Sequence, residues 1–386
     1  MANVHITLVG KQTYPVYLGI AETSPDRVIL VHSSTSIAEA QRVAEEFGKA
    51  EVEFDYVELD PVNVMEVLHR TFELAQSLSD EDYYTINLTS GTKVWSILFH
   101  EAFESKSHIQ FIYVDQICTV YDLSNGEILD SAWVEMERVF RLNNTSVLNS
   151  LDFKDLTTDD LNNIKTIRSL HQANWAVFTE LTVPKTRDGQ NAVNQIDGTF
   201  SFKGSSISWD HGTNSINFQL KPKKGLIEHE IIERTLSSPH IFDMVFNAGW
   251  FEAEVARQLS LWSYSHEVKL NVEFPYKDGN TKNEIDVIVN TGKRLLFVEC
   301  KTQINNHTDL DKFSNAVKNY GGTGCLAMFV TFGSMTQMAK EKCRDSSIIP
   351  FSFKDALDAA TEDAKKGAIT TALHQLLDER LFTINK

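Results

Sequence analysis

The sequence predicts an α/β protein with two α/β regions and a smaller α+β segment between them. Short apolar strands alternate with amphipathic helices through residues 1–140. A new series of strands and helices begins near residue 236, after a stretch rich in Gly, Asn and Ser. Of the 386 residues, 42% are hydrophobic and 23% are charged, as in ordinary globular proteins. A chain of this length has room for two or three cores.

Residues 1–140 show a regular alternation of strands and helices. Strands are predicted over Val4–Val9, Arg27–His32, Glu51–Leu59, Tyr84–Asn87 and Gln110–Asp115. Helices are predicted over Ile37–Phe47, Val64–Leu78 and Val94–Glu104, and a hairpin crosses Ser124–Gly126. Strands separated by helices of this length indicate a parallel, doubly wound sheet. Such a sheet binds ligands outside the carboxyl ends of its strands.

Residues 141–235 are predicted to form a small α+β connector. A helix begins within Leu156–Leu161, with Thr158 as its cap and acidic residues in its first turn, and continues to about Phe178. Short strands follow over Gly198–Phe202, Ile207–Trp209 and Ile216–Leu220. A helix-turn-helix is an alternative for this region, but no basic recognition face stands out.

Residues 236–386 are predicted to form a second α/β region. Its strands are expected over Glu267–Phe274, Glu284–Val289, Arg294–Cys300, Cys325–Thr331 and Ile348–Phe353. Its helices are expected over Gly249–Leu259, Leu310–Tyr320, Met335–Arg344 and a final stretch that ends near Leu377.

Charge is distributed unevenly along the chain. Residues 1–140 contain 8 basic and 23 acidic residues, which account for −15 of the total net charge of −17. Residues 141–235 are neutral, and residues 236–386 carry −2. The total is unfavourable for a nucleic-acid-binding protein, but the acidity belongs to the N-terminal region.

The cysteines and apolar runs indicate the cellular compartment. Cys118, Cys300, Cys325 and Cys343 form no CxxC pair, which argues against a zinc ribbon or a disulfide framework and suits the reducing cytoplasm. The longest apolar run, Cys325–Val330, is far shorter than the ~20 residues of a membrane helix. The N-terminus also lacks the blocks of a secretion signal. We therefore expect a cytoplasmic protein without a membrane segment.

A β-hairpin over residues 283–301 carries the strongest chemical signal. With a two-residue turn at Thr291-Gly292, Asp286 lies opposite Phe297 and diagonal to Glu299, with about 7–8 Å between Cα atoms. Lys301 follows Glu299 by two residues and shares its face. Two acids and a lysine then converge on one side of an otherwise apolar hairpin, whereas a three-residue turn would separate them.

This set of side chains suits phosphodiester hydrolysis. Asp286 and Glu299 are hard oxygen ligands for Mg²⁺ or Mn²⁺, which polarise a phosphate and acidify a bound water. Lys301 would position that water or stabilise the developing negative charge. The structural alternative is a solvated hairpin face with an incidental Glu-Lys pair.

Two loops at the ends of predicted strands form a second candidate site. They are Gly10-Lys11-Gln12-Thr13 and Asn87-Leu88-Thr89-Ser90-Gly91-Thr92-Lys93. The second leads directly into a helix, where Gly and small hydroxyl residues present backbone N–H groups to an anion and Lys93 adds a charge. The spacing is neither that of a Walker A loop nor GxGxxG. Simple capping of the helix by Thr89 or Ser90 is the structural alternative.

Asp286 followed by Glu299-Cys300-Lys301 resembles the active site of the PD-(D/E)XK restriction-endonuclease-like superfamily. Gly249-Trp250-Phe251-Glu252, at a helix start, resembles the helical glutamate of that superfamily. The resemblance implies Asp286, Glu299 and Glu252 as metal ligands and Lys301 as a catalytic residue. Alternatively, Glu252 only favours the helix dipole. No Pro precedes Asp286, and Glu284 lies on the same face of the strand, which leaves the assignment of the carboxylates open.

The loop Asn87–Lys93 resembles the ligand loop of CARF domains, the CRISPR-associated Rossmann-like sensors of cyclic oligoadenylate. A CARF-like region over 1–140, a connector over 141–235 and a PD-(D/E)XK region over 236–386 together resemble the CRISPR ancillary nucleases of type III systems. The resemblance implies a homodimer that holds one cyclic tetra-adenylate on its two-fold axis, with Lys11 and Lys93 as the available cations. It also implies metal-dependent nicking of DNA, often with cleavage of RNA as well, in antiviral defence. Closure of the loops on the ligand would then move the connector and bring the two nuclease sites to a productive spacing.

Two other functions remain open on sequence alone. A CARF-type ligand-sensing transcriptional regulator would bind DNA without cutting it and would need a basic helix-turn-helix, for which the neutral residues 141–235 give little support. A Holliday-junction or restriction-type nuclease would use its N-terminal region only as a scaffold. The Asp286, Glu299 and Lys301 set favours an enzyme.

Overall fold

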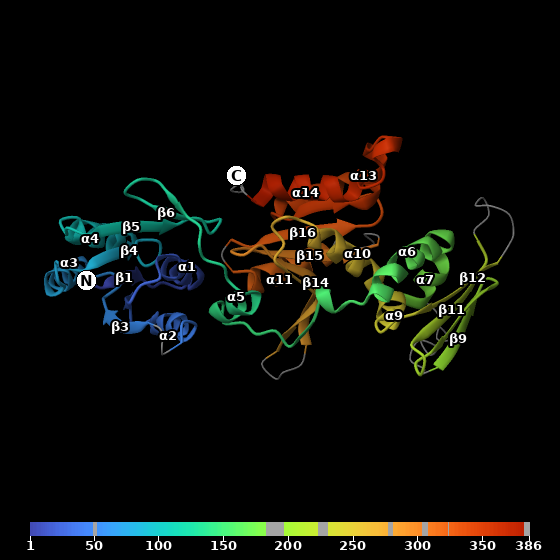
Figure 1. Cartoon of the computed structure of the whole chain (residues 1–386), viewed down its shortest axis with the longest axis horizontal. Coiled ribbons are helices and arrows are strands. Elements are labelled where there is room, and N and C mark those ends of the chain that lie inside the picture. Colours follow the sequence, from blue (N-terminus) through green and yellow to red (C-terminus); the bar gives the residue numbers. More distant parts are fainter. Residues whose placement is uncertain are drawn as a thin grey trace.

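The computed structural model describes residues 1–48, 52–182, 197–222, 231–276, 281–302, 308–322 and 324–381. Three β-sheets follow one another along the long axis of the molecule (Figure 1). The N-terminal sheet lies at one end, a small antiparallel sheet lies at the other, and the C-terminal sheet lies between them. We call them the first, second and third sheets in chain order.

The first sheet is doubly wound, as predicted, with strand order β3-β2-β1-β4-β5-β6-β7. Its strands are β1 (Asn3–Leu8), β2 (Arg27–His32), β3 (Glu53–Glu58), β4 (Tyr83–Asn87), β5 (Ile109–Val114), β6 (Val120–Asp122) and β7 (Ile128–Leu129). The first five are parallel, and β6 and β7 add the predicted antiparallel hairpin at one edge. Glu51, the predicted start of the third strand, lies outside the described residues.

Helices cover both faces of the first sheet. They are α1 (Tyr14–Thr23) and α2 (Ile37–Glu45) on one face, and α3 (Val64–Ser77) and α4 (Lys93–Phe103) on the other. The sequence pattern predicts α2, α3 and α4 but not α1. Every residue from Tyr14 to Ile20 is buried, so α1 lacks the alternation of apolar and polar faces that marks a surface helix.

The predicted connector lies beside the third sheet rather than between the two larger sheets. After α5 (Met136–Leu142), strand β8 (Asn149–Asp152) pairs with β13 at the edge of the third sheet. Next come α6 (Thr158–Ala173) and α7 (Trp175–Thr182), and then the antiparallel second sheet of β9 (Asp197–Phe202), β10 (Ser205–Asp210), β11 (Ser215–Leu220) and β12 (Ile232–Ser237). The cap of α6 is Thr157, which forms a capping box with Asp160, and not Thr158 as predicted.

The third sheet has the strand order β17-β16-β15-β14-β13-β8. Its remaining strands are β13 (Glu267–Pro275), β14 (Thr281–Asn290), β15 (Leu295–Lys301), β16 (Leu326–Thr331) and β17 (Ile349–Ser352). The helices around it are α9 (Ile241–Phe246), α10 (Gly249–Ser260), α11 (Thr308–Tyr320), α12 (Gln337–Asp345), α13 (Phe353–Ala359) and α14 (Ala368–Leu381). Each predicted element of this region is present, with its ends displaced by a few residues. In the described part of the chain, no helix is long and apolar enough to span a membrane.

Apolar cores on the two faces of the third sheet join it to both neighbours. One core runs from Tyr14 and Ile20 of α1 to Phe297 of β15. The other links Trp209 of the second sheet with Trp250 of α10 and the third sheet. Each fully buried large apolar side chain contributes roughly 1.5–3 kcal/mol to folding. The third sheet is therefore held firmly to the elements on either side.

Candidate functional site

Strands β14 and β15 form the predicted hairpin, but their register differs from the prediction. Ile288 lies opposite Phe297, so the turn comprises the four residues Thr291–Arg294 instead of two. The same register places Asp286 opposite Glu299 rather than opposite Phe297. Side chains alternate with a period of two, and the register differs by two residues, so both carboxylates stay on one face.

Asp286, Glu299 and Lys301 meet at the end of the β14–β15 ladder. The Asp286 carboxylate accepts hydrogen bonds from the backbone N–H of Cys300 at 2.7 Å and from Lys301 Nζ at 3.4 Å. Lys301 Nζ also lies 2.6 Å from Glu299 Oε1. The Asp286 and Glu299 side chains are 12% and 15% exposed. The structure thus brings the three hairpin residues together in a largely buried cluster.

Burial and mutual repulsion shift the pKa values of this cluster. Burial, and then the charge of Asp286, raises the pKa of Glu299 to about 7. The same two causes raise the pKa of Glu252, in the first turn of α10, well above its ordinary value. Burial raises the pKa of Asp286 against the opposing charge of Lys301. Burial also lowers the pKa of Lys301, but Asp286 and Glu299 outweigh it and raise that pKa, so the lysine stays protonated. Glu252 therefore belongs to the same electrostatic cluster.

Two further acids act on the cluster. Asp243 on α9 and Glu284 on β14 both raise the pKa of Glu252. The sequence pattern did not reveal Asp243, because it belongs to a short helix without a motif of its own. In the structure, the Asp243 carboxylate lies against Gly249, where an added Cβ would lie 2.5 Å from Asp243 Oδ2. The absence of a side chain at Gly249 lets α10 begin against this carboxylate.

The chemistry of these residues fits a divalent cation. Carboxylate oxygens are the ligands that Mg²⁺ and Mn²⁺ prefer, and crowded acids with raised pKa values gain from an added positive charge. Within the described ranges, no three His, Cys, Asp or Glu side chains stand close enough together to hold a metal ion. Lys301 Nζ instead contacts both Asp286 and Glu299. A cation that used both carboxylates would displace at least one of these lysine contacts.

The two predicted ligand loops lie side by side at the carboxyl ends of β1 and β4. A Cβ on Gly10 would lie 3.3 Å from the backbone nitrogen of Gly91. The Ser90 hydroxyl donates to the Gln12 carbonyl at 3.4 Å. The strand order changes direction between β1 and β4, and doubly wound sheets bind ligands at this point.

Several loop residues hold the loops in shape with their side chains. The buried Thr13 hydroxyl donates to a carbonyl of α5 at 2.6 Å. Asn87 Oδ1 accepts from the N–H and the hydroxyl of Thr89 at 3.0 and 2.6 Å. The cap of α4 is Thr92, rather than Thr89 or Ser90 as in the capping alternative. Ser90 and Gln12 remain among the polar side chains at the surface of the loops.

The two loop lysines differ in their surroundings. Lys11 Nζ donates to the Thr35 carbonyl at 2.7 Å and pairs with Glu39 at 3.1 Å. Lys93 is the first residue of α4 and is exposed, and it has no ion-pair partner in the part of the chain that the structure describes. An anion at the loops can therefore engage Lys93 without breaking an existing pair.

Family models match the two regions that contain these residues. Residues 4–131 match the model of the Card1 CARF domain, and residues 243–356 match that of the Card1-like endonuclease domain. The chain joins a CARF domain to a Card1-like endonuclease domain. The loops Gly10–Thr13 and Asn87–Lys93 belong to the CARF domain, and Glu252, Asp286, Glu299 and Lys301 belong to the endonuclease domain.

Solved structures share this fold. Can2 from Sulfobacillus thermosulfidooxidans, in complex with cyclic tetra-adenylate, is 18% identical with a TM-score of 0.67, over 99% of this chain and 100% of that chain. Protein VC1899 from Vibrio cholerae is 15% identical with a TM-score of 0.71, over 97% of this chain and 98% of that chain. A type III CRISPR defence DNA nuclease activated by cyclic oligoadenylate is 15% identical with a TM-score of 0.56, over 91% of this chain and 48% of that chain. A search of curated proteins finds no match.

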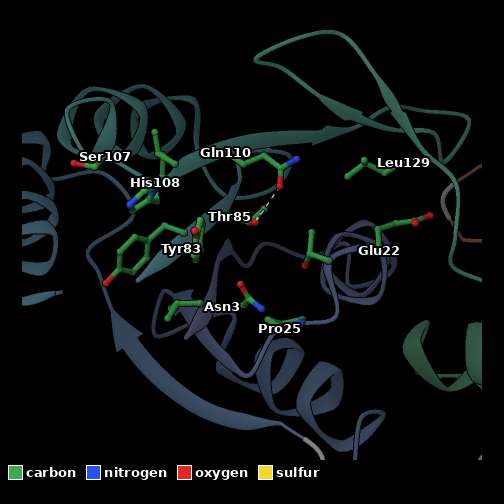
Figure 2. A pocket seen from close by; sticks show the side chains of 13 residues that line it. Asn3, Glu22, Pro25, Tyr83, Thr85, Ser107, His108, Gln110 and Leu129 are labelled. Carbon is green, nitrogen blue, oxygen red and sulfur yellow. Dashed lines mark hydrogen bonds between the residues drawn. The ribbon is translucent and has the colours of Figure 1, made fainter. Parts of the chain in front are cut away.

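The CARF domain also has a hollow of about 570 Å³ at the amino ends of its parallel strands, opposite the ligand loops (Figure 2). Asn3 and Tyr83, at the amino ends of β1 and β4, line it, and the Thr85 hydroxyl donates to Gln110 Oε1 at 3.2 Å on its wall. Residues of the predicted ligand loops do not line this hollow. It is a separate feature of the domain.

Proposed function

We propose that this chain is a metal-dependent nuclease that a cyclic oligoadenylate activates in CRISPR antiviral defence. One observation carries the nuclease assignment: Asp286 and Glu299 face each other around Lys301 at the end of the β14–β15 ladder. This ladder lies within the region that matches an endonuclease domain. The solved structures of a cyclic tetra-adenylate complex and of a CRISPR defence DNA nuclease support the ligand and the context.

In this proposal, the acids hold the cation and the lysine acts on the phosphate. A bound divalent ion polarises a phosphodiester and lowers the pKa of a bound water. Asp286 and Glu299 would be its ligands, and Glu252 would be a further ligand or would orient it. Lys301, as a protonated ammonium, would stabilise the negative charge that develops on the phosphate. DNA is the proposed substrate, with RNA as a further one.

The ligand loops suit a cyclic oligonucleotide held by two copies of the chain. The start of α4 presents backbone N–H groups to phosphate, and Lys93 adds a free positive charge. Cyclic tetra-adenylate has two-fold symmetry, which matches an isologous dimer in which each CARF domain binds half of the ring. The exposed apolar side chains Val62, Met65 and Ile97, on or beside α3 and α4, are 82%, 72% and 64% exposed and would suit such a contact.

Plasmid nicking tests this proposal. Purified protein is incubated with supercoiled DNA and Mg²⁺ or Mn²⁺, with and without cyclic tetra-adenylate, and with EDTA as a metal-free arm. We expect nicking that needs the metal and rises with the ligand. DNA binding without cutting in every arm would favour the transcriptional regulator, and full activity without ligand would leave a constitutive nuclease.

A further inference from the structure

The turn Thr291–Arg294 of the β14–β15 hairpin, which we call the catalytic hairpin, contacts the CARF domain directly. The hydroxyl of Tyr14, the first residue of α1, donates to the carbonyl of Lys293. Lys293 Nζ lies 2.5 Å from Glu22 Oε1 and 2.8 Å from Asp130 Oδ1, and it donates to the Leu129 carbonyl at 3.3 Å. All four partners belong to the CARF domain, and Figure 2 shows Glu22 and Leu129 near each other at one end of its hollow.

This turn is a stiff extension of the strands that carry the acids. Within it, the Thr291 N–H donates to the Arg294 carbonyl at 2.9 Å, and the Gly292 N–H donates to Asn290 Oδ1 at 2.9 Å. The ladder continues without a break from Asn290 to Val287 on β14. Asp286 is the next residue. A displacement of the turn therefore reaches the carboxylates through continuous hydrogen-bonded strand.

Helix α1 connects this turn with both ligand loops. The first loop ends at Thr13, and α1 begins at the next residue. The second loop starts at Asn87, whose Nδ2 donates to the Pro15 carbonyl in the first turn of α1 at 3.3 Å. An added Cβ on Gly19 would lie 2.3 Å from the same Nδ2, so helix and loop touch closely. Movement of either loop is thus passed to α1.

A second contact runs from the first loop to the same hairpin. The Thr13 hydroxyl donates to the carbonyl of Leu142, the last residue of α5. In that helix, Phe140 packs edge-to-face against Phe297 of β15, with 6.3 Å between ring centroids. The apolar core that contains α1 also contains Phe140 and Phe297. Both routes bypass the second sheet.

We propose that Tyr14 and Lys293 are positioning residues through which α1 couples occupancy of the ligand loops to the placement of Asp286 and Glu299. The inference rests on the proposed function and names the contacts that transmit ligand binding from the loops to the acids. From the sequence, the 141–235 segment is expected to move on ligand binding. In this inference the signal passes instead through direct contact between α1 and the catalytic hairpin. The hydrogen bonds and ion pairs described above for the two residues join them to each other and to Glu22, Asp130 and Leu129, not to Asp286, Glu299 or Lys301.

Four variants test this coupling. Tyr14→Phe removes one hydrogen bond and keeps the ring, Lys293→Ala removes the ion pairs, and Lys293→Arg restores the charge. The matched control is Lys106→Ala. Lys106 is a similarly buried lysine that contacts Asp80 at 2.7 Å and the Leu78 carbonyl at 2.8 Å, entirely within the CARF domain. For each protein, the rate of plasmid nicking is measured with saturating cyclic tetra-adenylate and without it.

The expected readout is the ratio of these two rates. We expect Lys293→Ala to lower the ratio at least about fivefold, and Tyr14→Phe to lower it in the same direction, since allosteric coupling is typically 5–150-fold. Lys293→Arg should recover most of the ratio, and Lys106→Ala should leave it unchanged even where it lowers the unfolding temperature. An unchanged ratio in folded Lys293→Ala, or an equal loss in Lys106→Ala, overturns the inference alone. A wild-type protein that does not respond to the ligand overturns the proposed function and the inference with it.

Discussion

Lys301 balances an excess of negative charge in the acidic cluster of the endonuclease domain. Its ammonium contacts Asp286 and Glu299, while Glu252 adds a third buried acid to the cluster. With one cation among three carboxylates, the folded protein resists full ionisation of the site, and the acids have raised pKa values. A divalent cation would supply the positive charge that balances these acids. The repulsion between the acids, which destabilises the metal-free protein, therefore favours metal binding.

The raised pKa of Glu299 predicts how stability depends on pH without metal. Its ordinary pKa is 4.5 and its folded value is about 7. The stabilisation of the folded protein by the proton on Glu299 is therefore fully present below pH 4.5 and is lost as pH rises through 7. We expect Glu299→Gln to be more stable than wild type by roughly 1–3 kcal/mol at pH 8 and about equal to it at pH 4.5. Urea unfolding in EDTA at both pH values measures this, and an equal difference at both would contradict the prediction.

Loss of either facing acid should abolish most cleavage. We expect Asp286→Ala and Glu299→Ala to lower the nicking rate at least ~10²-fold, because each removes a proposed metal ligand from a preorganised site. Calorimetry should still show cyclic tetra-adenylate binding, since the CARF loops are untouched. Glu362→Ala, at a side chain that is 86% exposed, is the control and should cut as wild type does. Near wild-type nicking by both variants would remove these acids from the site.

The two loop lysines should contribute unequally to ligand affinity. Lys93→Ala removes a charge-assisted phosphate contact worth roughly 1.5–3 kcal/mol per subunit. Lys11→Ala should cost less, because Lys11 must first leave Glu39 to reach a ligand. Calorimetry with cyclic tetra-adenylate compares the two variants. Equal losses, or a larger one for Lys11→Ala, would place the ring elsewhere on the loops.

At the scale of elements, the sequence predicts most strands and helices but not the contacts between domains. The third sheet and the hairpin residues follow from apolar alternation and the E-x-K spacing. Helix α1 escapes prediction because it is buried along its whole first part and lacks an amphipathic pattern. The four-residue turn escapes because Thr291–Arg294 fits more than one turn length, and Lys293 in it contacts Tyr14 and Glu22 from far along the chain. Asp243 is missed because its short helix, Ile241–Phe246, carries no motif of its own.

The close approach of α1 to β4 gives a prediction at this scale. Gly19→Ala would place a methyl group 2.3 Å from Asn87 Nδ2. Ala is the better helix former, yet we expect a net loss of roughly 1–3 kcal/mol, because the overpacked contact cannot relax without moving the loop. Gly212→Ala, at an exposed turn, should change stability by less than about 0.5 kcal/mol. Urea unfolding compares them, and a stabilised Gly19→Ala would show that α1 and the loop move apart freely.

At the scale of the whole molecule, the third sheet is the centre to which the other units are fixed. One apolar core is shared with α1 and α5, and the other is shared with the second sheet. The net negative charge, by contrast, is concentrated in residues 1–140, which carry −15 of the total of −17 because they contain few basic residues. The two domains therefore differ in net charge, while a shared apolar core packs them against each other.

The shared cores predict that the ligand stabilises the endonuclease domain as well as the CARF domain. A ligand at 100 times its Kd that binds only the folded state adds about 2.7 kcal/mol. Because Phe297 of β15 and Tyr14 of α1 lie in one core, we expect a single thermal transition that moves upward as a whole. Hydrogen exchange should slow in β14 and β15 as well as in the loops, and Lys93→Ala should reduce both effects together. Two separate transitions, of which cyclic tetra-adenylate moves only the first, would show that the domains unfold independently and that the core between them transmits little.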